Sequence, residues 1–87
     1  MCMALIFRFR NKVQIHVWPL DHGDIHAHVV YPPKAIEFKV FVHDYSVEHV
    51  TTNQFSASDE REIVKAVKAR ENQIKEKWHE FQEDQKK

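Results

Sequence analysis

The hydrophobic pattern changes its period near Ser56, and this change constrains the fold more than any other feature of the chain. Before it, apolar and polar residues alternate, most clearly over 13–18, as they do along half-buried β-strands. After it, apolar residues recur at spacings of three, four and seven, which is typical of one face of an α-helix. The recurring residues are Ile63, Val67, Ile74, Trp78 and Phe81. The chain is therefore expected to form a sheet first and a helix last.

Turn-forming residues divide the alternating half into strands. Pro19 ends one strand because it lacks the N–H that a sheet ladder needs, and Pro32 and Pro33 make a stiff loop after another. Ser56 is a good helix N-cap, with Asp59 three residues later. The expected strands cover about 4–10, 13–18, 25–31 and 35–43, and 47–51 would add a short fifth strand. The expected helix covers about 57–84.

These elements predict one α+β domain spanning 1–87. An antiparallel β-meander of four or five strands would be followed by one long C-terminal helix, packed on one face of the sheet. Within the first strand, Phe7 and Phe9 are expected to share a face with Leu5. A chain of 87 residues buries only ~60–65% of the surface that its unfolded form exposes, so its own core is marginal.

The predicted helix is longer than the predicted sheet. Its roughly 27 residues would extend about 40 Å, whereas a seven-residue strand extends only about 23 Å. The overhanging end would carry Trp78 and Phe81, and leaving each in water would forgo roughly 2–3 kcal/mol. We therefore expect both residues to contact a second copy in a homo-oligomer, a dimer or higher. The alternative is a helix that bends or breaks near 71–73 and folds back.

The charge of the chain argues against nucleic acid as a partner. Thirteen Lys and Arg balance thirteen Asp and Glu, so no net charge attracts a polyanion, and the same balance permits self-association. The single cysteine, Cys2, cannot form an internal disulfide, which fits the cytoplasm. The segment 1–9 is too short, and too interrupted by Arg8, for a signal peptide or a membrane span. We expect a cytoplasmic protein without a membrane partner.

The only glycine and three of the seven histidines lie in the stretch Asp21-His22-Gly23-Asp24-Ile25-His26-Ala27-His28-Val29. His26 and His28 are two residues apart on a predicted strand, so both point to the face opposite the helix. The simplest hairpin register places His28 between His16 and Lys39. The same register places His26 between two aromatic residues. The candidate residues for an interface or a small-ligand pocket are therefore His16, Trp18, His26, His28, Lys39 and Phe41.

The histidines also allow an enzymatic interpretation. With Asp21 or Asp24, the pattern His22-x-x-x-His26-x-His28 supplies ligand types that zinc or another transition metal binds. Without a metal, histidine titrates near neutrality and suits acid–base, hydrolase-like chemistry. Lys39 beside these rings disfavours a dication, and no Ser or Cys nucleophile set accompanies them. A homo-oligomeric binding or regulatory module, with a protein or small-molecule partner, is the first hypothesis, and the enzyme is the alternative.

The stretch resembles a bacterial family, the domain-of-unknown-function family forty-one sixty. Its members carry a strand running into Glu-His-x-Pro-Pro-His-x-His-Val, then a strand pair, then Phe-Ser and a long helix ending near a Trp. Here all three histidines match, Asp21 replaces the Glu, and Asp24-Ile25 replaces the proline pair. Phe55-Ser56-Ala57 and Trp78 match the later part, so the resemblance covers roughly 12–81. It implies the same order of elements and an accessory or mobile-element gene, but no established activity or cofactor. The short chain also resembles proteins carried on mobile gene cassettes.

Overall fold

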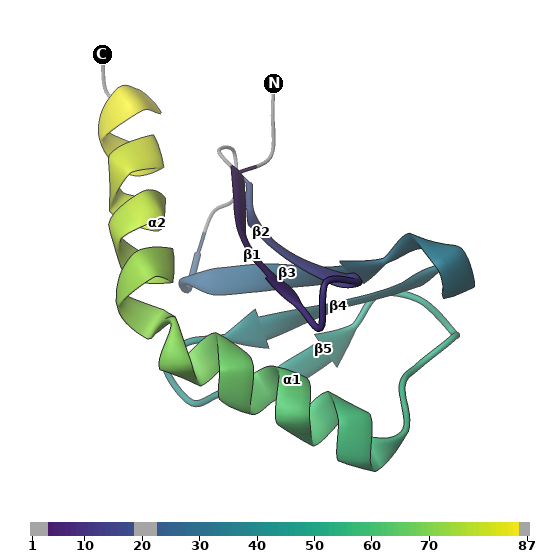
Figure 1. The fold of residues 1–87 in the computed structure, drawn as a ribbon. Helices are drawn as coiled ribbons and strands as arrows, with labels where there is room; N and C mark the ends of the chain where they lie inside the picture. The colour runs from purple at the N-terminus through teal and green to yellow at the C-terminus, as the bar shows by residue number, and fades with distance from the viewer. Residues whose placement is uncertain (1–3, 19–22, 86–87) are drawn as a thin grey trace.

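The structure is a computed structural model that describes residues 4–18 and 23–85 (Figure 1). Its strands are β1 (Ala4–Phe9), β2 (Val13–Val17), β3 (His26–Tyr31), β4 (Ile36–Phe41) and β5 (Val47–His49). The short 3₁₀ helix η1 (Pro32–Lys34) joins β3 to β4, and the helices α1 (Ala57–Ala69) and α2 (Glu71–Gln85) follow β5. The strands form one antiparallel sheet in the order β1-β2-β3-β4-β5. The α+β class and the meander are confirmed, and 47–51 does contain a fifth strand.

The prediction of one long helix is wrong, because two helices meet at Arg70. α1 begins as predicted at the N-cap Ser56, whose hydroxyl oxygen accepts a 3.2 Å hydrogen bond from the Asp59 N–H. α1 ends where the Arg70 N–H donates to the Val67 carbonyl at 3.0 Å, a tightened last turn. α2 then leaves in a new direction (Figure 1). The apolar stripe continues across this point without glycine or proline, so its period does not reveal the break.

Contacts from two parts of the sheet fix the helix break. Tyr45, in the turn between β4 and β5, donates its hydroxyl hydrogen to a carboxylate oxygen of Glu71, in the first turn of α2. The Lys68 ammonium lies 5.2 Å from the centre of the Tyr45 ring, and the Arg70 guanidinium lies 5.0 Å from the centre of the Phe7 ring on β1. The direction of α2 is therefore set by side chains that are distant in sequence.

The core lies between the sheet and the two helices. Ile15, Val29 and Phe38 are opposite one another across β2, β3 and β4, and all three are fully buried. Ile63 of α1 and Ile74 of α2 are buried against them in one apolar cluster. Burying each such side chain stabilises the fold by about 1.5–3 kcal/mol. No helix in residues 4–18 and 23–85 combines the length and the apolar character needed to cross a membrane.

A β-bulge in β1 changes which face its first residues occupy. Leu5 pairs with His16, and Phe7 pairs with Ile15. His16 and Ile15 are consecutive on β2, so Ile6 is an extra residue on β1. Directly opposed residues share a face, so Leu5 lies on the His16 side of the sheet and Phe7 on the core side. The expectation that Leu5 shares a face with Phe7 is therefore wrong. Leu5 is 42% exposed.

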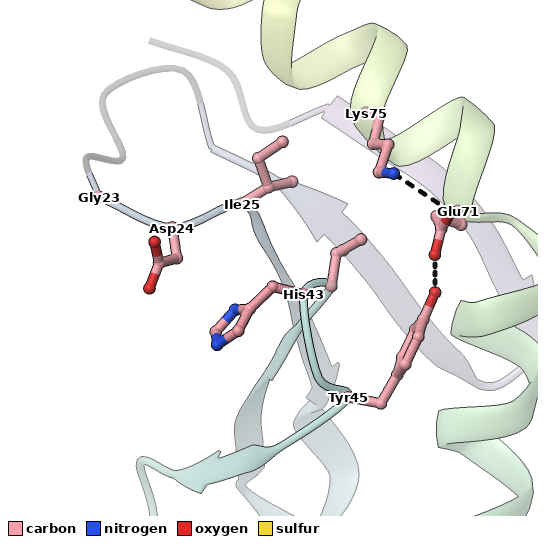
Figure 2. A pocket seen from close by; sticks show the side chains of 8 residues that line it. Gly23, Asp24, Ile25, His43, Tyr45, Glu71 and Lys75 are labelled. Carbon is pink, nitrogen blue, oxygen red and sulfur yellow. Dashed lines mark hydrogen bonds and ion pairs between the residues drawn. The ribbon is translucent and has the colours of Figure 1, made fainter.

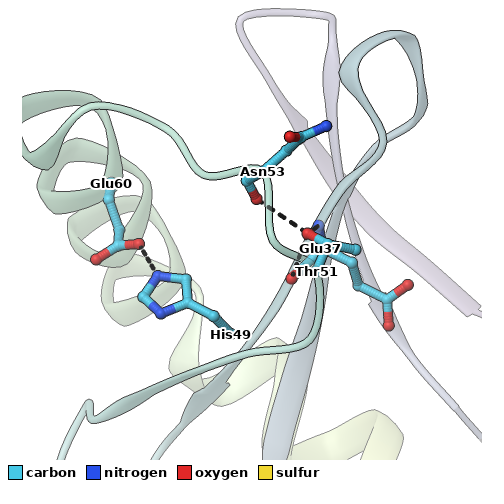
Figure 3. Close-up of polar contacts among 5 residues, drawn as sticks. All are labelled: Glu37, His49, Thr51, Asn53 and Glu60. Atoms are coloured by element: carbon cyan, nitrogen blue, oxygen red, sulfur yellow. Dashed lines mark hydrogen bonds and ion pairs between the residues drawn. The ribbon is translucent and has the colours of Figure 1, made fainter.

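Polar contacts tie the segment before α1 to the sheet (Figure 3). The Glu37 N–H donates to the Thr51 hydroxyl at 3.0 Å, and that hydroxyl donates to the Asn53 carbonyl at 2.9 Å. The His49 Nε2 lies 2.5 Å from a carboxylate oxygen of Glu60 on α1. These contacts position the N-terminal half of α1 beneath β4 and β5.

Candidate functional site

The histidine stretch has three of the cross-strand pairs that the sequence predicted. His28 lies opposite His16 on β2 and opposite Lys39 on β4, while His26 lies opposite Phe41. These residues occupy the outer face of the sheet, defined here as the face opposite the one that carries Ile15, Val29 and Phe38. The hydrophobic alternation therefore determined the register as well as the strands.

Two imidazoles pack with aromatic rings, and His16 lies beside them opposite His28, in what we call the histidine cluster. Two ring contacts define its centre. The Trp18 and His28 rings stack with centroids 4.5 Å apart and planes inclined by 22°, and the His26 ring meets the His28 ring edge-on at 5.0 Å. His16, His26 and His28 are only 6%, 5% and 4% exposed. The cluster comprises His16, Trp18, His26, His28, Phe41 and Trp78.

Trp78 enters this cluster from α2, contrary to the expectation that it overhangs the sheet. It is 5% exposed, and its ring centroid lies 5.3 Å from that of His26. Phe81 is half-buried and packs against the core. Both side chains are therefore covered to a large extent within one chain. The overhang argument for an oligomer fails at Trp78, and self-association needs a different surface.

The hydrogen bonds of two imidazoles show which ring nitrogen carries a proton. His26 donates from Nδ1 to the Asp24 carbonyl at 2.8 Å, because a carbonyl can only accept. His16 donates from Nε2 to the side-chain oxygen of Gln14, also at 2.8 Å. The His28 Nδ1 lies 3.8 Å from a carboxylate oxygen of Glu37. The cluster is thus held by hydrogen bonds from two imidazoles as well as by ring packing.

The surroundings of His16 change its titration. Burial lowers its pKa from the ordinary value of 6.5, and the neighbouring His28 and Arg8 lower the pKa further by repelling a positive charge. Its Nδ1 is buried and has no hydrogen-bond partner in the described part of the chain. His16 is therefore kept neutral at pH 7, with one ring nitrogen as an unused acceptor.

The metal prediction rests partly on residues whose structure is not described. Asp21 and His22 lie outside the described ranges, and the Asp24 contact with His26 uses the backbone carbonyl. Within residues 4–18 and 23–85, no three or more His, Cys, Asp or Glu side chains are grouped so that they could hold a metal ion. A site formed by His22, His26 and His28 therefore stays a prediction.

A cavity of about 510 Å³ lies beside the cluster, where the stretch 23–25 meets the turn after β4 and the start of α2 (Figure 2). Tyr45, Glu71 and Lys75 form a polar chain on one side, with the Lys75 ammonium 3.3 Å from a Glu71 carboxylate oxygen. Asp24 lines the other side. The sequence did not predict this cavity, because Glu71 and Lys75 reach it only after the chain turns at Arg70.

The fold and the cluster define an α+β protein in which a five-stranded meander carries a buried histidine–tryptophan cluster. No family model, curated protein or solved structure matches the chain. Its function must therefore be inferred from its own geometry.

Proposed function

We propose that this protein is a small binding module that pairs with a second copy of itself through the outer face of its sheet. The supporting observation is the exposure of two large apolar side chains on that face, Leu5 at 42% and Trp18 at 37%. Leu5 pairs with His16, and Trp18 follows His16 by two residues, so the two are diagonal neighbours on one face. Adjacent exposed apolar side chains favour an interface over bare surface.

The geometry of Trp18 suits an interface anchor. One face of its indole stacks on the buried His28 ring, so little side-chain freedom remains to be lost on association. The outer face also carries charges of both signs, with Arg8 exposed and Glu37 and Lys39 half-buried. A surface with both signs can meet its own copy across a two-fold axis, where each residue contacts the equivalent surface of the partner.

Light scattering coupled to size-exclusion chromatography tests this proposal at about 50 μM protein. We expect the wild-type chain to be a dimer and Leu5→Glu to be a monomer. The matched control is Val50→Glu, because Val50 is also exposed, at 51%, but follows β5 at the opposite edge of the sheet. A monomeric wild type, or equal effects of the two substitutions, would contradict the proposal. Far-UV circular dichroism checks that each variant is folded.

A second candidate function is the binding of a small zwitterion in the cavity beside the cluster. The observation that favours it is the placement of Asp24 across the cavity from Lys75 (Figure 2). The cavity has a volume of about 510 Å³, which lies within the range found for small-molecule sites. Titration with 4-aminobutyrate, followed by amide chemical shifts, should show binding that Asp24→Asn weakens. Equal shifts with butyrate alone would exclude recognition of the ammonium group.

A further inference from the structure

A second cavity, of about 340 Å³, lies far from the histidine cluster, where β2 begins and β3 ends. Its lining comes from the β1–β2 turn, from β3 with η1, and from the N-terminal half of α1 with the residue before its cap. None of these residues belongs to the histidine cluster or to the surface proposed for self-association. The cavity therefore requires an explanation of its own.

The inner part of this cavity is apolar and largely aromatic. Val13 and Ile63 form a buried floor, and the half-buried rings of Phe9, Tyr31 and Phe55 line the walls. The Tyr31 and Phe55 rings are held 5.6 Å apart, centroid to centroid. Aromatic walls over an apolar floor suit a flat ring, which gains both burial and ring contacts there.

The rim of the cavity is cationic. Arg10, Lys12 and Lys34 line it, and Asp59 is the one acidic residue among the lining side chains, so the lining has a formal net charge of +2. The whole chain, by contrast, has a formal net charge of zero. Arg10 and Asp59 are 4.0 Å apart but 66% and 52% exposed, so their ion pair is weak. The Arg10 guanidinium also lies 4.9 Å from the centre of the Phe9 ring, where the cationic rim meets the aromatic wall.

Two turns that include left-handed residues hold this rim in place. Arg10 and Asn11 have φ angles of 52° and 60°, in the region that favours glycine, and the Lys12 N–H closes the turn on the Phe9 carbonyl at 3.1 Å. η1 is closed by a left-handed Ala35, and the Lys34 carbonyl accepts a 2.8 Å hydrogen bond from the Asn53 amide. The cations thus project from backbone that is fixed before any ligand arrives, which reduces the cost of binding.

We propose that this cavity binds a small aromatic anion, a single ring that carries a phosphate or carboxylate group. The ring lies between the aromatic walls, and the anionic group lies at the rim between Arg10, Lys12 and Lys34. Neither half of the cavity recognises this ligand alone, because the rim cations are too exposed to hold an anion tightly and the walls have no preference for charge. This proposal does not depend on self-association or on the cavity at Asp24.

The test uses the full-length chain labelled with ¹⁵N and three probes: phenyl phosphate, inorganic phosphate and phenol. We expect phenyl phosphate to shift the amide signals of Tyr31, Lys34 and Phe55, and to bind about tenfold more tightly than either single-feature probe. Its affinity should fall with added salt, because the rim charges face solvent. No shift with phenyl phosphate, or equal affinity for inorganic phosphate, overturns the proposal.

Matched variants locate the site. Lys12→Gln combined with Lys34→Gln should weaken phenyl phosphate binding about fivefold to tenfold, since two exposed charge contacts are lost. Lys65→Gln, an exposed lysine on α1 that does not line the cavity, should leave binding unchanged. These lysines are exposed, so all variants should keep the wild-type amide spectrum outside the affected residues. Unchanged binding by the double variant, or an equal loss in the control, overturns the assignment.

Discussion

The indole of Trp78 lies 5.3 Å from the imidazole of His26, measured between ring centroids. This contact joins the last helix to the histidine stretch, and it exists only because the chain changes direction at Arg70. Ile74, one helical turn earlier, is fully buried in the core. Ile74 and Trp78 of α2 both belong to the core, and Trp78 also joins the core to the histidine cluster.

Trp78→Ala should destabilise the fold strongly. Removal of a buried indole leaves a cavity between α2 and His26, and such truncations cost about 3–5 kcal/mol. The measurement is the free energy of unfolding from urea titration. His79→Ala, an exposed position next along the same helix, serves as the control and should change that free energy little. A loss below about 1 kcal/mol for Trp78→Ala would mean that the indole is not buried in solution.

Tyr45→Phe should show how far one hydrogen bond stabilises the helix break. The Tyr45 hydroxyl donates to the Glu71 carboxylate, and a bond to a charged acceptor contributes about 1.5–3 kcal/mol. Urea unfolding of Tyr45→Phe, Glu71→Gln and the double variant gives the coupling energy between the two residues. Tyr31→Phe removes the other tyrosine hydroxyl, far from the break, and is the control. Additive losses would show that the two side chains do not interact.

Stability should fall in mildly acidic solution because of His16. Its pKa is lowered in the folded chain, so the unfolded chain binds more protons between that lowered pKa and the ordinary value of 6.5. The free energy of unfolding therefore decreases as the pH falls through 6.5 and levels off below the folded pKa. We expect His16→Gln to flatten this slope in urea titrations from about pH 5 to 8. The exposed His43→Gln is the control, and a slope unchanged by His16→Gln would refute the prediction.

Zinc should leave the melting temperature unchanged. His26 uses its Nδ1 for the Asp24 carbonyl, and the His26 and His28 rings meet edge-on within a buried cluster. The Nδ1 hydrogen bond of His26 can persist when Nε2 ligates a metal, but zinc would have to separate the packed rings of the buried cluster. An ion stabilises a fold only when it binds the folded form more tightly. The measurement is a thermal melt of untagged protein with zinc and with a chelator. A zinc-dependent rise that His22→Ala removes would instead establish the metal site.

Several parts of the site were predictable because they depend on local pattern. The alternation along the strands predicted which residues face inward and which face outward. Combined with short hairpins, it also predicted the pairs His16–His28, His28–Lys39 and His26–Phe41. The cap at Ser56 was also predictable, since it is a local hydrogen bond. The face of the sheet on which Leu5 lies was not predictable, because the bulge adds one residue to β1 and no sequence signal marks it.

The sequence by itself determined the α+β class, the order of the strands and the composition of the histidine face, because these follow from residue periodicity. Only the tertiary structure decided where the helix breaks and what that break brings together. Arg70 ends α1 although the apolar stripe runs on, and contacts from Tyr45 and Phe7, both distant in sequence, fix the new direction. The burial of Trp78 against His26 and the cavity beside Asp24 follow from that turn. A hydrophobic period specifies which face of a helix is buried, but the surface that covers it is chosen by packing with the rest of the chain.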